Sequence, residues 1–155
     1  MNGDRSALVN PSDRMGQVVL PSLIDGKPQE VISYGKCSSV IASIHGLSCA
    51  ACRRYLEELA ARAREFAEWE GRVVIVSAER SGGLEIPFAL LLDSDGQLKR
   101  AARIGIPSIL IVDRWGSVQL RHEAREAHDF LAPSEIEDWL RYLAIQCPEC
   151  QGEVF

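Results

Sequence analysis

The sequence predicts an α/β fold in which a mixed sheet is covered on both faces. Two apolar runs of strand length, 40–44 and 72–77, flank a segment whose apolar side chains recur at helical spacing. A strand, a long helix and a second strand in this order form a unit whose strands run parallel, and parallel strands are buried on both faces. A later pair of apolar runs, 109–112 and 117–121, is typical of a hairpin, which adds antiparallel strands to the parallel pair.

Composition places the chain among ordinary globular proteins. It has 155 residues, of which 46% are hydrophobic and 25% charged, as expected for a single domain. The net charge of -5 argues against nucleic acid or an acidic membrane as the main partner. No window is apolar enough for a membrane span, and residues 1–17 lack the apolar core of a signal peptide. We therefore expect a cytoplasmic protein, in which the five cysteines favour redox or metal chemistry over structural disulfides.

The N-terminal part predicts a β-hairpin ahead of the central strand. Residues 1–16 are polar and turn-rich, and we expect a flexible lead-in there. Residues 17–20 are expected to form an edge strand. The segment 25–27, Asp-Gly-Lys, is typical of a hairpin turn and leads to a second strand at 30–33.

The central strand at 40–44 runs directly into a helix that carries two cysteines. Ser48 is a residue type favoured at the N-cap, and Gly71 is one favoured just after a helix end. The sequence therefore predicts one long helix, with Cys49 at the junction of strand and helix and Cys52 one turn inside.

This placement favours redox chemistry at Cys49. The first turn of a helix offers unpaired backbone N–H groups and partial positive charge, both of which stabilise a thiolate. A thiolate attacks disulfides or peroxides, and a second cysteine three residues on can resolve the adduct. We expect Cys49 to be the exposed nucleophile and Cys52 the more buried resolving thiol; the alternative is two core cysteines beside a tight turn. Cys37 has no cysteine nearby in sequence and is interpreted as a small residue at a strand entrance.

The second half of the chain is expected to supply the remaining elements. Residues 87–92 are interpreted as partly extended. The turn at 93–96 has paired acids but no further calcium ligands, and it precedes a short helix at 97–103. After the hairpin strands, 121–129 is highly charged and is expected to be a solvated connection. A capping-box pattern at 134–137 opens a last helix with one apolar face.

The order of these elements resembles the thioredoxin-like superfamily. The resemblance lies in Cys-Ala-Ala-Cys opening the first helix and Gly-Ile-Pro-Ser at 105–108 preceding a late strand. Within the superfamily the chain is similar to the redoxin branch, which includes thioredoxin-like thiol reductases and the alkyl hydroperoxide reductase/thiol-specific antioxidant proteins. The resemblance covers residues 17–146 and leaves 147–155 as a C-terminal tail. It implies a three-layer α/β/α sandwich with a mixed central sheet and an N-terminal β-hairpin extension supplied by 17–34.

The resemblance also implies substrate-binding residues beside the two cysteines. In thioredoxin-like proteins the proline before the late strand is cis and lies against the active-site cysteines, which implies that role for Pro107. The backbone of Ile106 is implied to pair with an extended substrate segment. Ser48 stands where an aromatic residue commonly precedes the first cysteine. Ser48, Ile106 and Pro107 are thus the expected substrate-binding residues.

Two departures from the family pattern bear on the chemistry. The buried acid that thioredoxins place six residues before the first cysteine falls on Ser43, so proton transfer to and from Cys52 needs another group. His45 is the nearest titratable candidate, and the alternative for it is a turn residue hydrogen-bonded to the backbone. The threonine that peroxiredoxins place three residues before their reactive cysteine falls on Gly46, which leaves peroxide reduction in that style unsupported.

The leading functional hypothesis is a thiol–disulfide oxidoreductase that uses Cys49 and Cys52 and no cofactor. Its expected partners are a protein or small-molecule disulfide and an external thiol reductant. A peroxiredoxin-like thiol peroxidase is the alternative. The competing class is a zinc-binding or interaction module without redox turnover, because the two Cys-x-x-Cys pairs together offer four thiols.

The second pair, Cys147-Pro148-Glu149-Cys150, leaves three interpretations open. It is a redox relay that passes electrons to the first pair, an inert or structural disulfide at a helix stop, or half of a zinc site completed by the second subunit of a dimer. Partial negative charge at a helix C-terminus and the Glu149 carboxylate both disfavour a thiolate. We therefore expect this pair to be less nucleophilic than Cys49.

Overall fold

The computed structural model describes residues 6–8, 14–80, 84–124 and 129–146. Its main feature is a six-stranded mixed sheet with the order β1-β8-β7-β4-β5-β6. The strands β4, β5 and β6 run parallel, β7 runs antiparallel to β4 and β8, and β1 runs antiparallel to β8. The strands of this sheet are β1 (Ser6–Leu8), β4 (Ser38–Ile44), β5 (Gly71–Ser77), β6 (Ala89–Leu92), β7 (Ser108–Val112) and β8 (Val118–Glu123).

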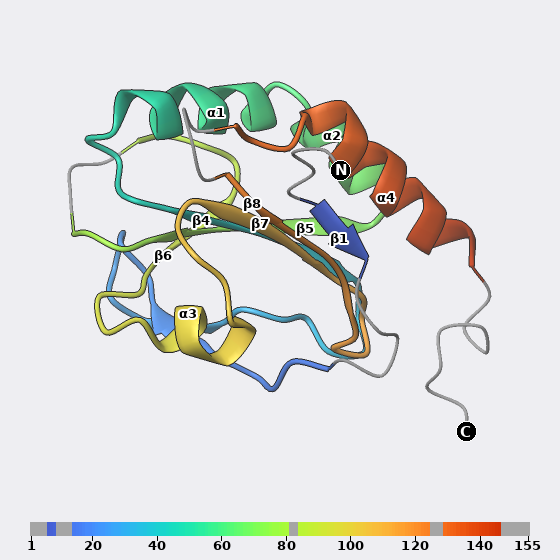
Figure 1. Cartoon of the computed structure of the whole chain (residues 1–155), viewed down its shortest axis with the longest axis horizontal. Helices are drawn as coiled ribbons and strands as arrows, with labels where there is room; N and C mark the ends of the chain where they lie inside the picture. The colour runs from blue at the N-terminus through green and yellow to red at the C-terminus, as the bar shows by residue number, and fades with distance from the viewer. Residues whose placement is uncertain (1–5, 9–13, 81–83, 125–128, 147–155) are drawn as a thin grey trace.

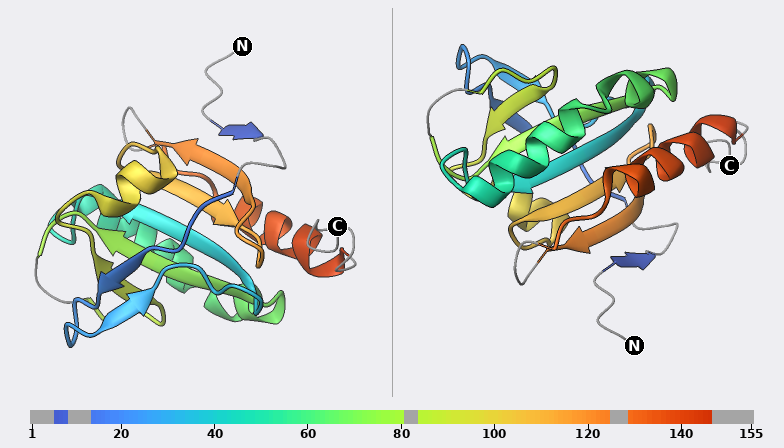
Figure 2. Two further views of the ribbon diagram at one scale, coloured as in Figure 1. Left: turned by 90° about the horizontal axis from the view of Figure 1, so that it is seen from below. Right: turned by 90° about the horizontal axis from the view of Figure 1, so that it is seen from above.

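Helices and a hairpin cover the two faces of this sheet, which makes three layers (Figure 1). One face carries α1 (Ala50–Ala60), α2 (Ala63–Glu68) and α4 (Pro133–Ile145). The opposite face carries α3 (Gln97–Ala102) and the antiparallel hairpin of β2 (Val19–Pro21) and β3 (Pro28–Glu30), as the two views in Figure 2 show. The predicted α/β architecture with an N-terminal hairpin is therefore confirmed.

The central strand β4 shows why the sequence folds this way. All its residues from Ser39 to Ile44 are buried, as a strand between two layers requires. Because side chains alternate along a strand, Val40, Ala42 and Ile44 join the core beneath α1 and α4, whereas Ile41 joins the core beneath α3 and the hairpin. The apolar run thus supplies both cores at once.

The segment predicted as one long helix is two helices. The chain leaves α1 at Ala61, re-enters a helix at Ala63, and ends α2 at Trp69. The residue in the left-handed conformation after α2 is Glu70 (φ 57°), not the glycine that follows. Gly71 is needed for space instead, because a Cβ there would lie 2.5 Å from Cδ1 of the buried Leu140.

Three further expectations differ from the structure at the ends of the elements. A strand, β1, lies inside the segment expected to be a flexible lead-in. The last helix begins at Pro133 with Ala132 as N-cap and no side-chain cap, so the capping box at 134–137 is not used. Strand β8 continues to Glu123, so the start of the expected solvated connection at 121–129 belongs to the sheet. His122 in this strand is buried, and its ring Nε2 lies 2.7 Å from the carbonyl oxygen of Asp129. No helix in the described ranges is long and apolar enough to cross a membrane.

Candidate active site

The sheet topology brings the predicted site residues to one edge. The carboxyl end of β4 leads into His45 and then into α1. In the neighbouring strands Ser43 is paired with Ser108 of β7, and the carbonyl of Ile44 accepts a hydrogen bond of 3.1 Å from the backbone N–H of Ala78 after β5. The segment before β7, which carries Pro107, therefore reaches the same edge as the two cysteines.

Cys49 occupies the N-cap position of α1. Its backbone is extended (φ -78°, ψ 116°), its N–H donates to the carbonyl of Gly46 at 3.2 Å, and its own carbonyl accepts from the N–H of Arg53 at 2.9 Å. No side chain caps the first turn, so the expectation that Ser48 is the N-cap is wrong. Cys49 is half-buried, and as the N-cap residue it stands at the partially positive end of the helix.

Cys52 lies one turn further on and is completely buried. Its Sγ lies 3.9 Å from Nδ1 of His45. Burial raises the pKa of the Cys52 thiol to about 11; the backbone of His45 opposes this rise, and the neighbouring Cys49 adds to it. Cys52 is therefore protonated at neutral pH, and its sulfur lies within hydrogen-bonding distance of the His45 ring.

The three side chains form one compact cluster. An imidazole nitrogen of His45 and the sulfurs of Cys49 and Cys52 all lie within 4.8 Å of one another, and neither cysteine is in a disulfide. The structure thus brings together the two predicted redox residues and the predicted proton-transfer candidate.

We expect Cys49 to be alkylated before the other described cysteines. It combines partial exposure with a helix N-terminus, whereas Cys52 is fully buried and its thiol pKa is raised. Iodoacetamide should modify the reduced protein first at Cys49 at about pH 7, as read by peptide mass mapping over time. Earlier modification of Cys52 or Cys37 would contradict the roles assigned to the pair.

The buried Cys52 thiol should make the reduced protein less stable as the pH rises. Its folded-state pKa of about 11 lies above the value of about 8.5 for an unfolded cysteine. Between these values the folded protein keeps a proton that the unfolded chain has lost, so the free energy of unfolding falls as pH increases. We expect a loss on the order of 2–3 kcal/mol between about pH 8.5 and 11, measured by denaturant titration with a chelator present.

Cys52→Ala is the matched control for this pH dependence. Tyrosines also titrate in alkali, and burial raises the pKa of Tyr55. Subtracting the variant's profile from that of the wild type isolates the contribution of Cys52. Parallel profiles for the two proteins would show that Cys52 contributes nothing to the alkaline loss of stability.

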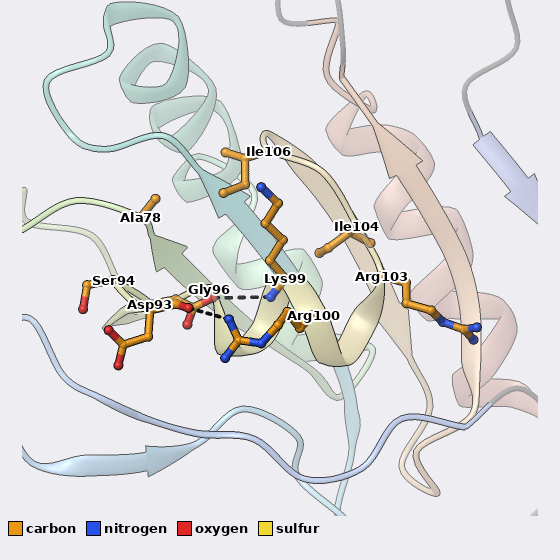
Figure 3. Close-up of a pocket in the computed structure, with 10 residues that line it drawn as sticks. Ala78, Asp93, Ser94, Gly96, Lys99, Arg100, Arg103, Ile104 and Ile106 are labelled. Carbon is orange, nitrogen blue, oxygen red and sulfur yellow. Dashed lines mark hydrogen bonds between the residues drawn. The ribbon is translucent and has the colours of Figure 1, made fainter.

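Ile106 lines a pocket on the face of the sheet that α3 covers. The Ile106–Pro107 peptide bond is cis, and the carbonyl of Pro107 accepts from the N–H of Ala124 at 2.9 Å. The pocket has a volume of about 690 Å³ and extends from Ile106 and Ala78 along α3. Figure 3 shows the Lys99 side chain reaching from α3 towards Ile106. The charged residues that line this pocket are Asp93, Asp95, Lys99, Arg100 and Arg103.

A second pocket lies on the α1 side of the dithiol. It has a volume of about 410 Å³ and is lined by Ala51, between the two cysteines, and by Phe130 and Pro133 before and in α4. Tyr55 forms one wall, where its ring stacks on Phe130 at 4.2 Å and its hydroxyl donates to the carbonyl of Leu131 at 2.6 Å. Of these two pockets, the second includes a residue of the Cys-x-x-Cys segment itself.

Glu79 is a charged neighbour of the site that the sequence reasoning missed. A Cβ placed on Gly46 would lie 2.7 Å from Oε1 of Glu79, so this carboxylate packs against the loop between His45 and Cys49. The position of Glu79 could have been predicted from the sequence. Glu79 follows β5 by two residues, and the carboxyl ends of parallel strands share one edge. Glu79 thus places a carboxylate beside the loop that joins β4 to α1.

The second cysteine pair, Cys147 and Cys150, lies outside the described residues. Gln146, the residue before it, lines a small cavity of about 40 Å³ together with Cys37 and Ser38. Cys37 precedes β4, so this cavity is at the opposite end of the strand from Cys49.

The chain combines a thioredoxin-like fold with a Cys-x-x-Cys pair at the start of α1. No protein-family model matches the sequence, and a search of curated proteins finds no match either.

Solved structures with the same fold include thiol–disulfide exchange proteins and peroxiredoxins. A protein from Chlorobium tepidum described as the thiol:disulfide interchange protein DsbE superposes with a TM-score of 0.71 at 17% identity, covering 88% of this chain and 99% of its own. A secreted thiol-disulfide isomerase from Corynebacterium glutamicum gives 0.72 at 14% identity, covering 94% and 95%. The peroxidoxin BcpB from Mycobacterium tuberculosis gives 0.67 at 15% identity, covering 87% and 97%. These likenesses confirm the thioredoxin-like fold.

Proposed function

We propose that this protein is a thiol–disulfide oxidoreductase that uses Cys49 as nucleophile and Cys52 as resolving thiol. The observation that carries the proposal is the pair itself: a half-buried free thiol at a helix N-cap next to a fully buried free thiol. This pairing supplies an accessible attacker and a protected second thiol in one turn of helix. The thiol:disulfide interchange and isomerase proteins among the structural neighbours support the same class of reaction.

The proposed reaction has two exchange steps. The Cys49 thiolate attacks one sulfur of a substrate disulfide, the substrate S–S bond breaks, and the released substrate thiolate takes a proton. Cys52 then attacks the sulfur of Cys49 in the mixed disulfide and releases the second substrate thiol. His45, 3.9 Å from Cys52, accepts the proton that Cys52 gives up. An external thiol reductant returns the Cys49–Cys52 disulfide to the dithiol.

Substrate binding in this proposal uses the rim of the dithiol loop. Ser48 is exposed immediately before the nucleophile, and Ile106 lines the neighbouring pocket. An extended segment of a protein disulfide would pair with the backbone at Ile106 and Pro107. A cytoplasmic location is part of the proposal, since a reducing compartment keeps such a dithiol reduced; the Corynebacterium protein, by its description, is secreted.

A stoichiometric reaction with oxidised glutathione tests the function. One equivalent should convert the reduced protein into a form lighter by two hydrogens, with the new disulfide between Cys49 and Cys52 and two equivalents of reduced glutathione released. A persistent glutathione adduct on Cys49, or no reaction, would contradict the proposal. A hydrogen peroxide arm separates the thiol peroxidase: peroxide consumption as fast as disulfide reduction would favour that activity instead.

The C-terminal pair is proposed to be a relay to the active-site disulfide. Replacing Cys147 and Cys150 together by serine should slow steady-state turnover while leaving the first attack by Cys49 unchanged in a single-turnover experiment. Turnover equal to that of the wild type would support the interpretation that the C-terminal pair is inert. Zinc bound by the purified reduced wild type but not by the double variant would favour the metal interpretation.

A further inference from the structure

The cluster at the start of α1 has the donor atoms of a metal site. His45, Cys49 and Cys52 supply one imidazole nitrogen and two sulfurs, all within 4.8 Å of one another. Within the ranges that the structure describes, no other set of three histidine, cysteine or acidic side chains comes together in this way. Two thiolates and an imidazole are the donor set that thiophilic cations such as Zn²⁺ and Cu⁺ prefer.

The spacing of these atoms fits a single ion. With Zn–S near 2.3 Å and Zn–N near 2.0–2.1 Å, a sulfur and a nitrogen on one ion lie about 3.6 Å apart at a tetrahedral angle and about 3.8 Å apart at a trigonal one. The distance from Cys52 Sγ to His45 Nδ1 is 3.9 Å. The remaining pairs are at most 4.8 Å apart, so a shift of roughly 1 Å would bring all three donors onto one ion.

We infer that the reduced dithiol and His45 form a Cys₂His site for one thiophilic d¹⁰ cation, Zn²⁺ or Cu⁺. Three protein donors leave the fourth position of a tetrahedral ion open, as in catalytic rather than structural zinc sites. Binding breaks two S–H bonds and forms two metal–sulfur bonds, and both protons pass to the buffer. No electron is transferred, so the step needs no oxidant or reductant.

The surroundings of the cluster are compatible with a bound cation. Cys52 is buried, and a cation there would neutralise its thiolate. The Glu79 carboxylate packs against Gly46 in the same loop and adds negative charge nearby. The guanidinium of Arg53 on α1 donates from Nη1 to the carbonyl of Leu47 in this loop at 3.2 Å.

The cation-bound form is a second state of the proposed active site, and cation binding does not require that the site reduce disulfides. A metal and a disulfide require the same two sulfurs, so they exclude each other. The cation-bound form is expected to be inactive towards disulfides and protected from oxidation. If the dithiol bound the cation but did not reduce disulfides, the proposed metal site would still be supported.

Metal binding by the full chain tests the inference. The Cys147→Ser/Cys150→Ser variant is used throughout, because it removes the second pair of thiols. The reduced protein is titrated with Zn²⁺ against a chromophoric chelator, and in a second arm with Cu⁺ against a Cu⁺-specific chelator. We expect one equivalent to bind, with a thiolate-to-metal charge-transfer absorption when Co²⁺ is used as a spectroscopic probe.

Single substitutions in that background identify the ligands. Cys49→Ser should lower the affinity by at least about 100-fold and His45→Ala by at least about 10-fold. Cys37→Ser should leave it unchanged, because Cys37 lies at the other end of β4. The oxidised protein should bind no ion. Thermal unfolding of each variant verifies that it is folded.

Two outcomes would overturn the site. One is the absence of a bound equivalent of either cation in the reduced protein. The other is binding that His45→Ala leaves unchanged in a folded variant, which would reduce the site to the two thiols. The glutathione reaction, run on the same preparations with a chelator, reports separately on the proposed function. Loss of that reaction with intact metal binding would refute the oxidoreductase and leave the metal site standing.

Discussion

Cys52→Ser is expected to stop the protein at a mixed disulfide. Cys49, half-buried at the N-cap of α1, remains able to attack, but the buried thiol that would displace the product is gone. Turnover of a disulfide substrate should fall on the order of 1000-fold or more, because nucleophile and resolving thiol act as a unit. Mass spectrometry should show the substrate attached to Cys49. Cys49→Ser should lose turnover as completely and accumulate no adduct.

Cys37→Ser is the matched control for this experiment. Cys37 is also a free cysteine with intermediate burial, but it precedes β4, whereas Cys49 follows it. The seven residues of β4 separate the two thiols, which corresponds to roughly 20 Å of strand. Wild-type turnover is expected for Cys37→Ser. Turnover of Cys52→Ser within about 10-fold of the wild type would show that another thiol resolves the adduct.

Tyr55→Ala should cause a large loss of stability. Tyr55 lies on α1 one turn after Cys52, is 3% exposed, stacks on Phe130, and donates its hydroxyl proton to the carbonyl of Leu131. Removing the ring leaves a cavity between α1 and the segment that enters α4, at a cost of about 3–5 kcal/mol in the free energy of unfolding. Denaturant titration of the reduced protein measures this loss.

Two further variants separate the parts of this contact. Tyr55→Phe keeps the stacked ring but leaves the carbonyl of Leu131 without its donor, and should cost about 1–2 kcal/mol. Tyr142→Ala removes a ring that is 50% exposed on α4, and should change stability by less than about 0.5 kcal/mol. A loss below about 1 kcal/mol for Tyr55→Ala would mean that the 130–133 segment is not held by this side chain.

The pattern of apolar residues was enough to predict most of the elements, but it missed β1, merged α1 with α2 and misplaced several ends. Helix caps were the least predictable: Ser48 and Ser134 have the chemistry of N-caps, yet the caps are Cys49 and Ala132. The reason is that the packing of the whole segment, and not the chemistry of one side chain, sets the residue at which a helix begins.

The candidate site also has a part that the sequence predicts and a part that only the tertiary structure shows. Cys49 and Cys52 are a local motif, so their spacing on one turn of helix follows from the sequence itself. The distance of 3.9 Å between His45 and Cys52 also involves residues close in sequence, but it depends on how the loop after β4 turns. The contact of Glu79 with Gly46 joins two different strands, and a single sequence carries no direct record of which strands are neighbours.

The sequence by itself thus determined the α/β class and the strand–helix junction, because both depend on local periodicity. It also determined the position of the thiol pair, because the two cysteines lie within one turn of each other. Only the tertiary structure decided which groups surround the pair. Strand order brings Glu79, Ile106 and Pro107 to the edge where Cys49 lies, and the covering layers bury Cys52 deeply enough to raise its pKa. Strand pairing and burial both arise from contacts between residues that are far apart in sequence. The chemistry of the site depends on these contacts.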